Sequence, residues 1–517
     1  MRPFAAIPGI AMMLAASMMA AEQVHIDSGA IEGATSADGT VRIYKGIPYA
    51  APPVGDLRWK PPQPVAAWTG VRQATEFGAR CAQGRIYDDM VFRDKGPSED
   101  CLYLNVWAPL PPPDKKPMPV MVWIHGGGFV AGASSEPRQD GENLAHKGVI
   151  VVSMNYRLGV FGFLAHPELT RESDHNASGN YGLRDQVAAL QWVHRNIEAF
   201  GGNPYNVTIF GESAGSMSVS ALLATPLTDQ LIEKAIGESG ASFGTLSAVP
   251  RLIAETKGTE FAKQAGAKSL AELRAKSTDE ILQVSLKPDP FRFAADIDGY
   301  FLPEPVGSLY KDEMESHVPL LAGWNANEGG ADEIFEKDKP TAKNFVKRVK
   351  ALYPLKADEV LKVYPASNDQ EAIKSAGDLA GDRFIAYATW KWIEMHLLTS
   401  KSPVYRYQFD QAPPQAAGAK GGSPGAYHSA EIEFVFNVLP SKNLPWRPED
   451  TKLADLMSSY WTNFAKTGDP NGPGLPKWPQ YTADDHYPVM HLSATPAAEP
   501  DGHRDRYLVL DAPYGGK

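Results

Sequence analysis

The sequence predicts an α/β fold, in which a large and mostly parallel central sheet carries helices on both faces and a helical cap region beside it. Short apolar runs rich in β-branched residues alternate with segments of helical character, and this alternation favours parallel strands joined by helices. The runs lack a polar face, which is typical of strands buried on both sides. The predicted strands are 102–107, 120–124, 149–154, 207–210, 235–238 and 319–323.

Apolar residues from Leu183 to Phe200 recur at helical spacing, and they predict one of the covering helices. Helix-forming composition also dominates 252–282 and 341–400, and we assign these two segments to the cap. At the N-terminus, Val24–Ile31 and Val41–Tyr44 flank the turn residues Ala37-Asp38-Gly39 and predict an opening hairpin.

Residues 1–21 have the pattern of a secretory signal: Arg2, then an apolar stretch, then small residues at Ala20 and Ala21. The apolar stretch is short for a membrane span, and no other stretch is long enough to be one. We therefore expect a secreted or periplasmic protein, with a disordered or internal start as the alternative.

Bulk composition is that of a globular protein: 517 residues, 43% hydrophobic and 21% charged, with a formal charge of −11. This balance excludes a basic nucleic-acid surface. No low-complexity linker or internal repeat divides the chain, so we expect residues 22–517 to form a single domain, although length alone would favour about three. The oligomeric state is not readable from the sequence.

Cys81 and Cys101 are the two cysteines of the chain. In an exported protein, such an isolated pair is best explained by one disulfide. The alternatives are two free thiols or a metal site, but no histidine cluster accompanies the pair, as a zinc site requires.

The motif Gly211-Glu212-Ser213-Ala214-Gly215 lies between a predicted strand and a helix-like run. Strand, G-x-S-x-G turn and helix make a nucleophile elbow, in which a tight turn exposes the serine hydroxyl. By itself the motif could also be a turn with a capping serine. In its context it predicts a serine hydrolase with Ser213 as the nucleophile.

A serine nucleophile needs a base and an acid, and in α/β-hydrolases these follow the serine in the order acid, then histidine. We assign the acid to Glu328, just past the strand 319–323, where ligands bind at the carboxyl ends of parallel strands. Asp296 and Asp298 are the rivals, and a solvated loop glutamate is the plain alternative for Glu328.

We assign the base to His428, because it follows a Gly-rich loop from which a histidine can extend to a strand end. His396 falls within a predicted helix and is better explained by packing. The remaining weaker candidates are His486, His491 and His503.

The loop His125-Gly126-Gly127-Gly128-Phe129 follows a predicted strand and predicts an oxyanion hole. Glycines let the backbone approach a substrate and present its N–H groups to developing negative charge. Gly127, Gly128 and Ala214 are the expected donors. A phosphate-binding loop is the alternative, but no Walker lysine follows.

Four longer segments carry a family resemblance. The chain resembles the type-B carboxylesterases, which include cholinesterases and bacterial para-nitrobenzyl esterases. The matching segments are 200–215, 99–106, 45–50 and 52–55.

The resemblance implies the α/β-hydrolase fold, a Ser213–Glu328–His428 triad and a Cys81–Cys101 disulfide. It also implies that Glu212 lines the gorge behind the nucleophile and that Ser239 supports the histidine side. Glu99 and Arg157 match positions that imply a buried structural ion pair.

Substrate selectivity is less defined. Cholinesterases carry a choline-binding tryptophan in the cysteine loop, but the aromatic residues here are Tyr87 and Phe92, which argues against choline esters. We assign Phe129 and Phe293 to the pocket wall, with the core as the alternative for both.

Together these features predict an exported enzyme that hydrolyses small-molecule carboxylic esters and uses no metal or organic cofactor. A non-catalytic adhesion protein of the same fold is one alternative. The other is a hydrolase with the same triad whose substrate is an amide, a thioester or a lipid.

Overall fold

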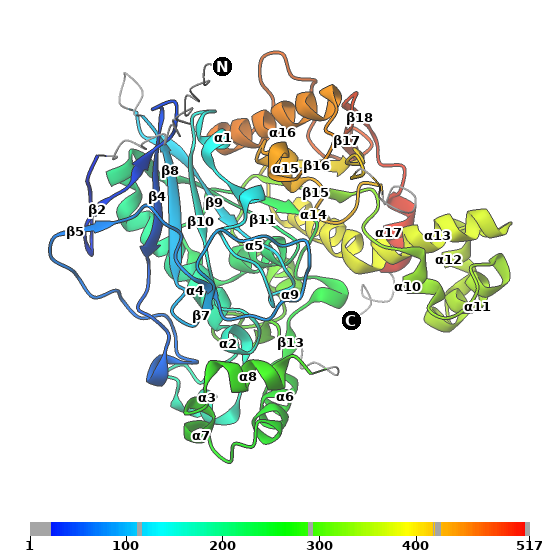
Figure 1. The fold of residues 1–517 in the computed structure, drawn as a ribbon. Coiled ribbons are helices and arrows are strands. Elements are labelled where there is room, and N and C mark those ends of the chain that lie inside the picture. The colour runs from blue at the N-terminus through cyan, green and yellow to red at the C-terminus, as the bar shows by residue number, and fades with distance from the viewer. Residues whose placement is uncertain (1–21, 111–115, 288–292, 417, 419–424, 512–517) are drawn as a thin grey trace, which may run out of the picture.

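The computed structural model describes residues 22–511 except 111–115, 288–292, 417 and 419–424 (Figure 1). The predicted signal segment 1–21 and much of the loop before His428 therefore lie outside the described residues.

A large twisted sheet runs through the centre of the molecule (Figure 1). Within the described residues it has eleven strands in the order β18-β17-β16-β15-β12-β11-β9-β10-β8-β4-β3. The strands from β10 through β9, β11, β12, β15 and β16 to β17 pair in parallel, and antiparallel strands complete both edges. Their bounds are β3 Ala34–Thr35, β4 Val41–Pro48, β8 Tyr103–Pro109, β9 Met118–Ile124, β10 Ile150–Met154, β11 Gly202–Glu212, β12 Lys234–Glu238, β15 Leu320–Asn325, β16 Val404–Phe409, β17 Pro488–Leu492 and β18 Ala497–Pro500.

The central strands are buried on both faces, because helices cover each side. Val122 of β9 belongs to one apolar core, while its neighbours Met121 and Trp123 belong to the other. Helices α4, α5 and α14 supply the first core, and α1, α15 and α16 supply the second. The predicted mostly parallel sheet with helices on both faces is confirmed.

The helices are α1 Glu142–Ala145, α2 Gly159–Phe163, α3 Pro167–Glu172, α4 Tyr181–Asn196, α5 Ala214–Ala224, α6 Arg251–Gln264, α7 Leu270–Arg274, α8 Thr278–Ser285, α9 Val306–Lys311, α10 Ala331–Phe335, α11 Ala342–Leu352, α12 Ala357–Val363, α13 Asp369–Gly381, α14 Tyr387–Thr399, α15 Ile432–Val435, α16 Pro448–Thr467 and α17 Arg504–Asp511. None of the helices within the described ranges has the length and apolar character needed to cross a membrane.

The helices outside the sheet layers form two groups rather than one cap. Figure 1 shows α6, α7 and α8 below the sheet, beside α3, and α10 to α13 projecting from the right of the molecule. Helix α14, which the sequence assigns to the cap, packs instead on β15 and β16.

The opening hairpin differs from its prediction. Val24–Ile31 is itself a hairpin of β1 (Val24–Ile26) and β2 (Gly29–Glu32), and it joins β5 (Val71–Gln73) in a separate three-stranded sheet. The chain turns at Gly29, whose φ of 147° suits glycine, and a Cβ there would lie 2.6 Å from the Trp68 ring. The turn at Ala37-Asp38-Gly39 connects β3 and β4 of the main sheet.

Candidate active site

Ser213 lies at a tight turn between β11 and α5, with φ 55° and ψ −119°. Positive φ is unfavourable for serine and marks a strained turn. The flanking glycines let this turn pack on the neighbouring strand: a Cβ at Gly215 would lie 2.0 Å from the carbonyl oxygen of Ile124, and one at Gly211 would lie 2.6 Å from it. The G-x-S-x-G spacing thus follows from how closely β9 passes the turn.

The structure brings Ser213, His428 and Glu328 together from three distant segments. Nε2 of His428 lies 3.0 Å from Oγ of Ser213, and Nδ1 lies 2.7 Å from Oε2 of Glu328. With Nδ1–H donating to the carboxylate, Nε2 is free to accept the hydroxyl proton of Ser213. The arrangement can therefore activate the serine as a nucleophile.

Two further donors hold the carboxylate of Glu328. Ser239 Oγ donates to its Oε1 at 2.6 Å, and the backbone N–H of Asn325 donates to the same oxygen at 2.7 Å. Ser239 therefore contacts the predicted acid directly, and it reaches the histidine only through that acid.

The loop that carries His428 is fastened to the loop that carries Glu328. Asn327 N–H donates to the carbonyl of Ala426 at 3.0 Å, and Ala426 N–H donates to Oδ1 of Asn327 at 3.0 Å. The side-chain amide of Asn325 donates to the carbonyl of Tyr427 at 2.7 Å. These bonds explain how a histidine about 100 residues away is positioned beside its carboxylate.

The glycine loop after β9 packs against the serine turn. A Cβ at Gly126 would lie 3.1 Å from Cβ of Ser213, and Gly127 and Gly128 have φ values of 100° and 62°. Among the described residues, no acceptor takes the N–H of Gly127, Gly128 or Ala214. These three predicted oxyanion donors remain available to a ligand.

Phe129 continues this loop and is buried, with its ring 5.0 Å from that of Phe163. It lines a pocket beside α5 together with Met217, Ala221 and Leu246. Phe293 is also buried, but its ring packs edge-on against Phe261 at 5.3 Å, as a core residue does.

The rival site residues have other partners. His396 is buried in α14, where its Nε2 lies 2.8 Å from the carbonyl of Val318, and burial lowers its pKa to about 4. His491 pairs with Asp410 at 2.7 Å. The carboxylate of Asp296 is the exception: among the described residues it is buried without a hydrogen-bond partner, and burial raises its pKa well above the ordinary range. Oδ1 of Asp298 accepts from the backbone of a nearby turn.

Glu212 stands behind the serine, with Oε1 3.3 Å from Nε2 of His428. Burial raises the pKa of Glu212 to about 7, although the nearby charges of His428 and Arg138 oppose this rise. Burial also lowers the pKa of His428, but the carboxylates of Glu212 and Glu328 outweigh it and raise that pKa above its ordinary value. The two groups therefore titrate as one coupled system.

Sequence reasoning missed two buried glutamates next to this system. Glu431 accepts a hydrogen bond from the amide of Asn325 at 2.6 Å, and burial, with the charge of Glu212, raises its pKa to about 8. Glu238 accepts from the indole of Trp461 at 2.7 Å, and burial raises its pKa well above the ordinary range. The sequence offered one signal for them: Glu431 lies three residues after His428, and Glu238 directly precedes Ser239.

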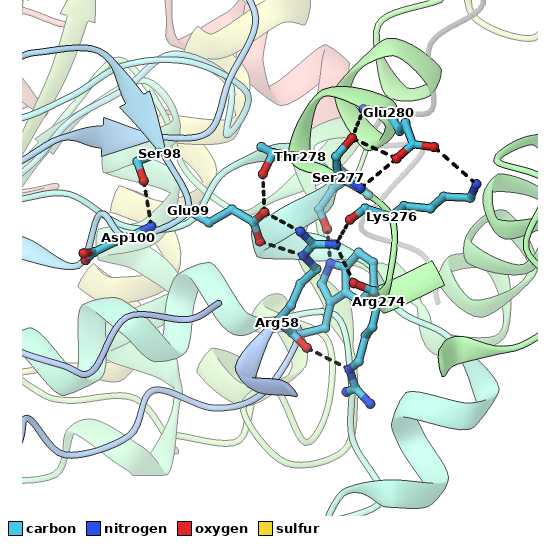
Figure 2. A network of polar contacts seen from close by, with 11 residues as sticks. Arg58, Ser98, Glu99, Asp100, Arg274, Lys276, Ser277, Thr278 and Glu280 are labelled. Carbon is cyan, nitrogen blue, oxygen red and sulfur yellow. Dashed lines mark hydrogen bonds and ion pairs between the residues drawn. The ribbon is translucent and has the colours of Figure 1, made fainter. Parts of the chain in front are cut away.

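The expected ion pair between Glu99 and Arg157 is wrong. Figure 2 shows Glu99 paired with Arg58, whose Nε and Nη2 lie 2.7 and 2.5 Å from its carboxylate, while Thr278 donates to Glu99 at 2.5 Å. Arg157 pairs instead with Asp185, whose carboxylate it meets at 2.8 and 2.7 Å. Each residue therefore belongs to a buried ion pair, but the two pairs are different ones.

Arg58 also connects two parts of the chain. Its guanidinium donates to the carbonyls of Arg274 and Lys276, at the junction between α7 and α8 (Figure 2). Cys81 and Cys101 form a disulfide, as predicted, and it lies beside Arg58 and Glu99. No group of histidine, cysteine, aspartate or glutamate in the described ranges is arranged to hold a metal ion.

Comparison with known proteins places this geometry in context. The profile of the Carboxylesterase family matches residues 20–507. The chain is 38% identical to para-nitrobenzyl esterase of Bacillus subtilis (strain 168), over 88% of this chain and 91% of that protein. It is 37% identical to fumonisin B1 esterase of Sphingopyxis macrogoltabida, over 88% and 84%.

A third relative is the medium-chain fatty acyl-CoA hydrolase precursor of Anas platyrhynchos, at 36% identity over 94% of this chain and 91% of that protein. Among solved structures, a PNB esterase superposes with a TM-score of 0.80 at 34% identity, covering 95% of this chain and 99% of that one.

Proposed function

The chain belongs to the Carboxylesterase family, and we propose that it hydrolyses carboxylic esters through an acyl-enzyme formed on Ser213, with His428 as base and Glu328 as acid. The family makes it a carboxylic-ester hydrolase with the α/β-hydrolase fold. The observation that carries the finer proposal is the chain of contacts from Ser213 to His428 at 3.0 Å and from His428 to Glu328 at 2.7 Å.

In the first half of the reaction, His428 accepts the proton of Ser213 while Oγ attacks the ester carbonyl. The carbonyl oxygen becomes negative and takes the N–H groups of Gly127, Gly128 and Ala214. His428 then gives its proton to the departing alcohol. Glu328 keeps the imidazole oriented and stabilises its charged form.

In the second half, water replaces the alcohol and the same residues act in reverse order. His428 takes a proton from the water, the hydroxide oxygen attacks the acyl carbon, and Ser213 recovers its proton as the acid leaves. These steps need only the residues named here.

We also propose that the protein is exported. The signal pattern in residues 1–21 and the Cys81–Cys101 disulfide, a bond typical of oxidising compartments, support this. N-terminal sequencing of the protein recovered from the periplasm or medium of an expressing bacterium tests the proposal. A mature protein that retains Met1 and stays in the cytoplasm contradicts it.

Hydrolysis of para-nitrophenyl esters from acetate to palmitate tests the mechanism. Replacing the nucleophile, Ser213→Ala, should lower kcat/KM by about 10⁶-fold, because the nucleophile and its base act as a unit. Ser367→Ala, at an exposed position of the described chain, is the control and should stay within a few-fold of the wild type. Trapping of the acyl group on Ser213 by rapid quench and mass spectrometry supports the covalent step.

Matched ester, amide and acyl-CoA substrates separate this proposal from the thioester and amide alternatives. A folded wild type that hydrolyses none of the para-nitrophenyl esters contradicts the general-esterase proposal. Unchanged activity in Ser213→Ala contradicts the assigned nucleophile.

A further inference from the structure

One long helical segment beside the site is interrupted by a wider turn. Between α13 and α14, residues Asp382–Ala386 form a π-helix, η6, in which the N–H of Tyr387 donates to the carbonyl of Asp382. Such turns insert one extra residue into a helix; they are rare, and they occur frequently at functional sites.

The π-helix begins where the helix meets the loop of the predicted acid. A Cβ at Gly381 would lie 3.2 Å from Cβ of Glu328, and a Cβ at Gly329 would lie 2.5 Å from the backbone nitrogen of Gly381. The two backbones therefore pack directly on each other, and the turn that follows is fixed relative to Glu328.

The side chains of the turn point in two directions. Asp382 is buried and accepts a hydrogen bond from Tyr364 at 2.7 Å, and Ile385 is buried in the core. Phe384 is not part of this core: its side chain is 39% exposed. The hydrogen bond to Asp382 holds the turn in place, and the turn sets the direction of the Phe384 side chain.

Phe384 faces the imidazole of His428. The two ring centroids are 5.1 Å apart and the ring planes meet at 73°, an edge-to-face arrangement. Glu328 and Ser213 hold the imidazole only through its two nitrogens, in the plane of the ring. Phe384 supplies the ring contact that those hydrogen bonds do not, because it restrains the imidazole from tilting out of that plane.

We propose that Phe384 is a positioning residue for His428, and that the π-helix exists to place its ring there. The inference rests on the proposed function, since it assumes that His428 is the base. It assigns Phe384 no role in binding the acyl or alcohol group.

The test compares Phe384→Ala with Phe384→Tyr, which keeps the ring, and with Ile373→Ala, a control of similar exposure in α13. Two measurements are made on each variant: steady-state hydrolysis of para-nitrophenyl acetate, butyrate and octanoate, and the rate of reaction with a fluorophosphonate probe. Displacement of a catalytic group by about 1 Å costs about 10²-fold in rate.

We expect Phe384→Ala to lower kcat by about 10- to 100-fold on all three esters, with KM within about threefold and a matching fall in the probe rate. Phe384→Tyr and Ile373→Ala should stay close to the wild type. If Phe384→Ala does not fold, Phe384→Leu takes its place, and we expect a smaller fall in kcat and in the probe rate.

A loss confined to KM, or to the longer esters, overturns the proposal because it identifies a substrate wall instead. Equal losses in the alanine and tyrosine variants also overturn it. If the probe labels the wild type and the Phe384→Ala variant at the same rate, this inference is refuted and the proposed function is not. A wild type that the probe does not label refutes the proposed function together with this inference.

Discussion

Two regions of the molecule bury carboxylates, and they neutralise them in different ways. Beside the disulfide, Glu99 meets Arg58 and, nearby, Asp185 meets Arg157, each through two hydrogen bonds. Behind the serine turn, Glu212, Glu238 and Glu431 are equally buried. No lysine or arginine of the described chain forms an ion pair with these three glutamates, and Glu212 lies 3.3 Å from Nε2 of His428.

The difference separates stability from titration. A carboxylate held by an arginine stays charged, so its pair acts as a fixed structural joint, and removing one partner leaves a buried charge. A buried carboxylate that no arginine or lysine pairs with has a raised pKa, because burial disfavours its charged form. We therefore expect the first region to act mainly on stability and the second on the pH dependence of the site.

The largest expected effect breaks the first region. Asp185→Asn leaves the buried guanidinium of Arg157 without a counter-charge, and we expect the free energy of unfolding to fall by about 3–5 kcal/mol. Urea unfolding at neutral pH measures this. Glu76→Gln, which breaks the exposed pair with Lys95, is the control and should leave the midpoint unchanged. Equal midpoints for Asp185→Asn and the wild type would show that the buried pair is not a structural joint.

A smaller effect tests the second region through activity. Glu212→Gln removes a carboxylate that favours the charged imidazole, so the pKa of His428 should fall. The acidic limb of the kcat/KM profile should then move to lower pH by about one unit. Glu198→Gln, at an exposed position of the described chain, is the control. A limb that stays in place or moves to higher pH contradicts the coupling.

A third effect tests the second region through stability. Because burial raises the folded-state pKa of Glu238, its contribution to stability is complete below its ordinary pKa of 4.5 and is lost as pH rises toward the folded value. Glu238→Gln keeps an oxygen for Trp461 but cannot ionise. Between about pH 5 and the folded pKa, the wild type should therefore lose about 1.4 kcal/mol more unfolding free energy than the variant for each pH unit. Parallel profiles would mean that Glu238 is charged in the folded protein.

Short sequence motifs predicted most residues of the candidate site. The G-x-S-x-G turn, the glycine loop and the order of acid before histidine pick out Ser213, Glu328 and His428, and the structure brings these three within hydrogen-bond distance. Such signals are readable because backbone geometry demands particular residues at short spacing. The catalytic roles themselves stay predictions.

Long-range pairing was not readable in the same way. Glu99 and Arg157 were both expected to be buried and charged, yet each found a different partner, Arg58 and Asp185. Any buried charge accepts any opposite charge that the fold brings near it, so spacing along the chain does not select the partner. The strand β16 was missed for a related reason: its Arg406 is buried by pairing with Asp501 and by packing on Trp324, which no local pattern announces.

By itself, then, the sequence determined the α/β class, the order of the central strands from β8 to β15 along the chain and the disulfide, and it nominated the three residues that the structure brings together. The strands follow from apolar runs, the serine turn follows from a short motif, and the disulfide follows because the chain has two cysteines. Only the tertiary structure decided the ion-pair partners, the cluster of buried glutamates behind Ser213 and the contact of Phe384 with His428. Those contacts join segments far apart in the chain, and their energies depend on burial, which exists only after the chain has folded.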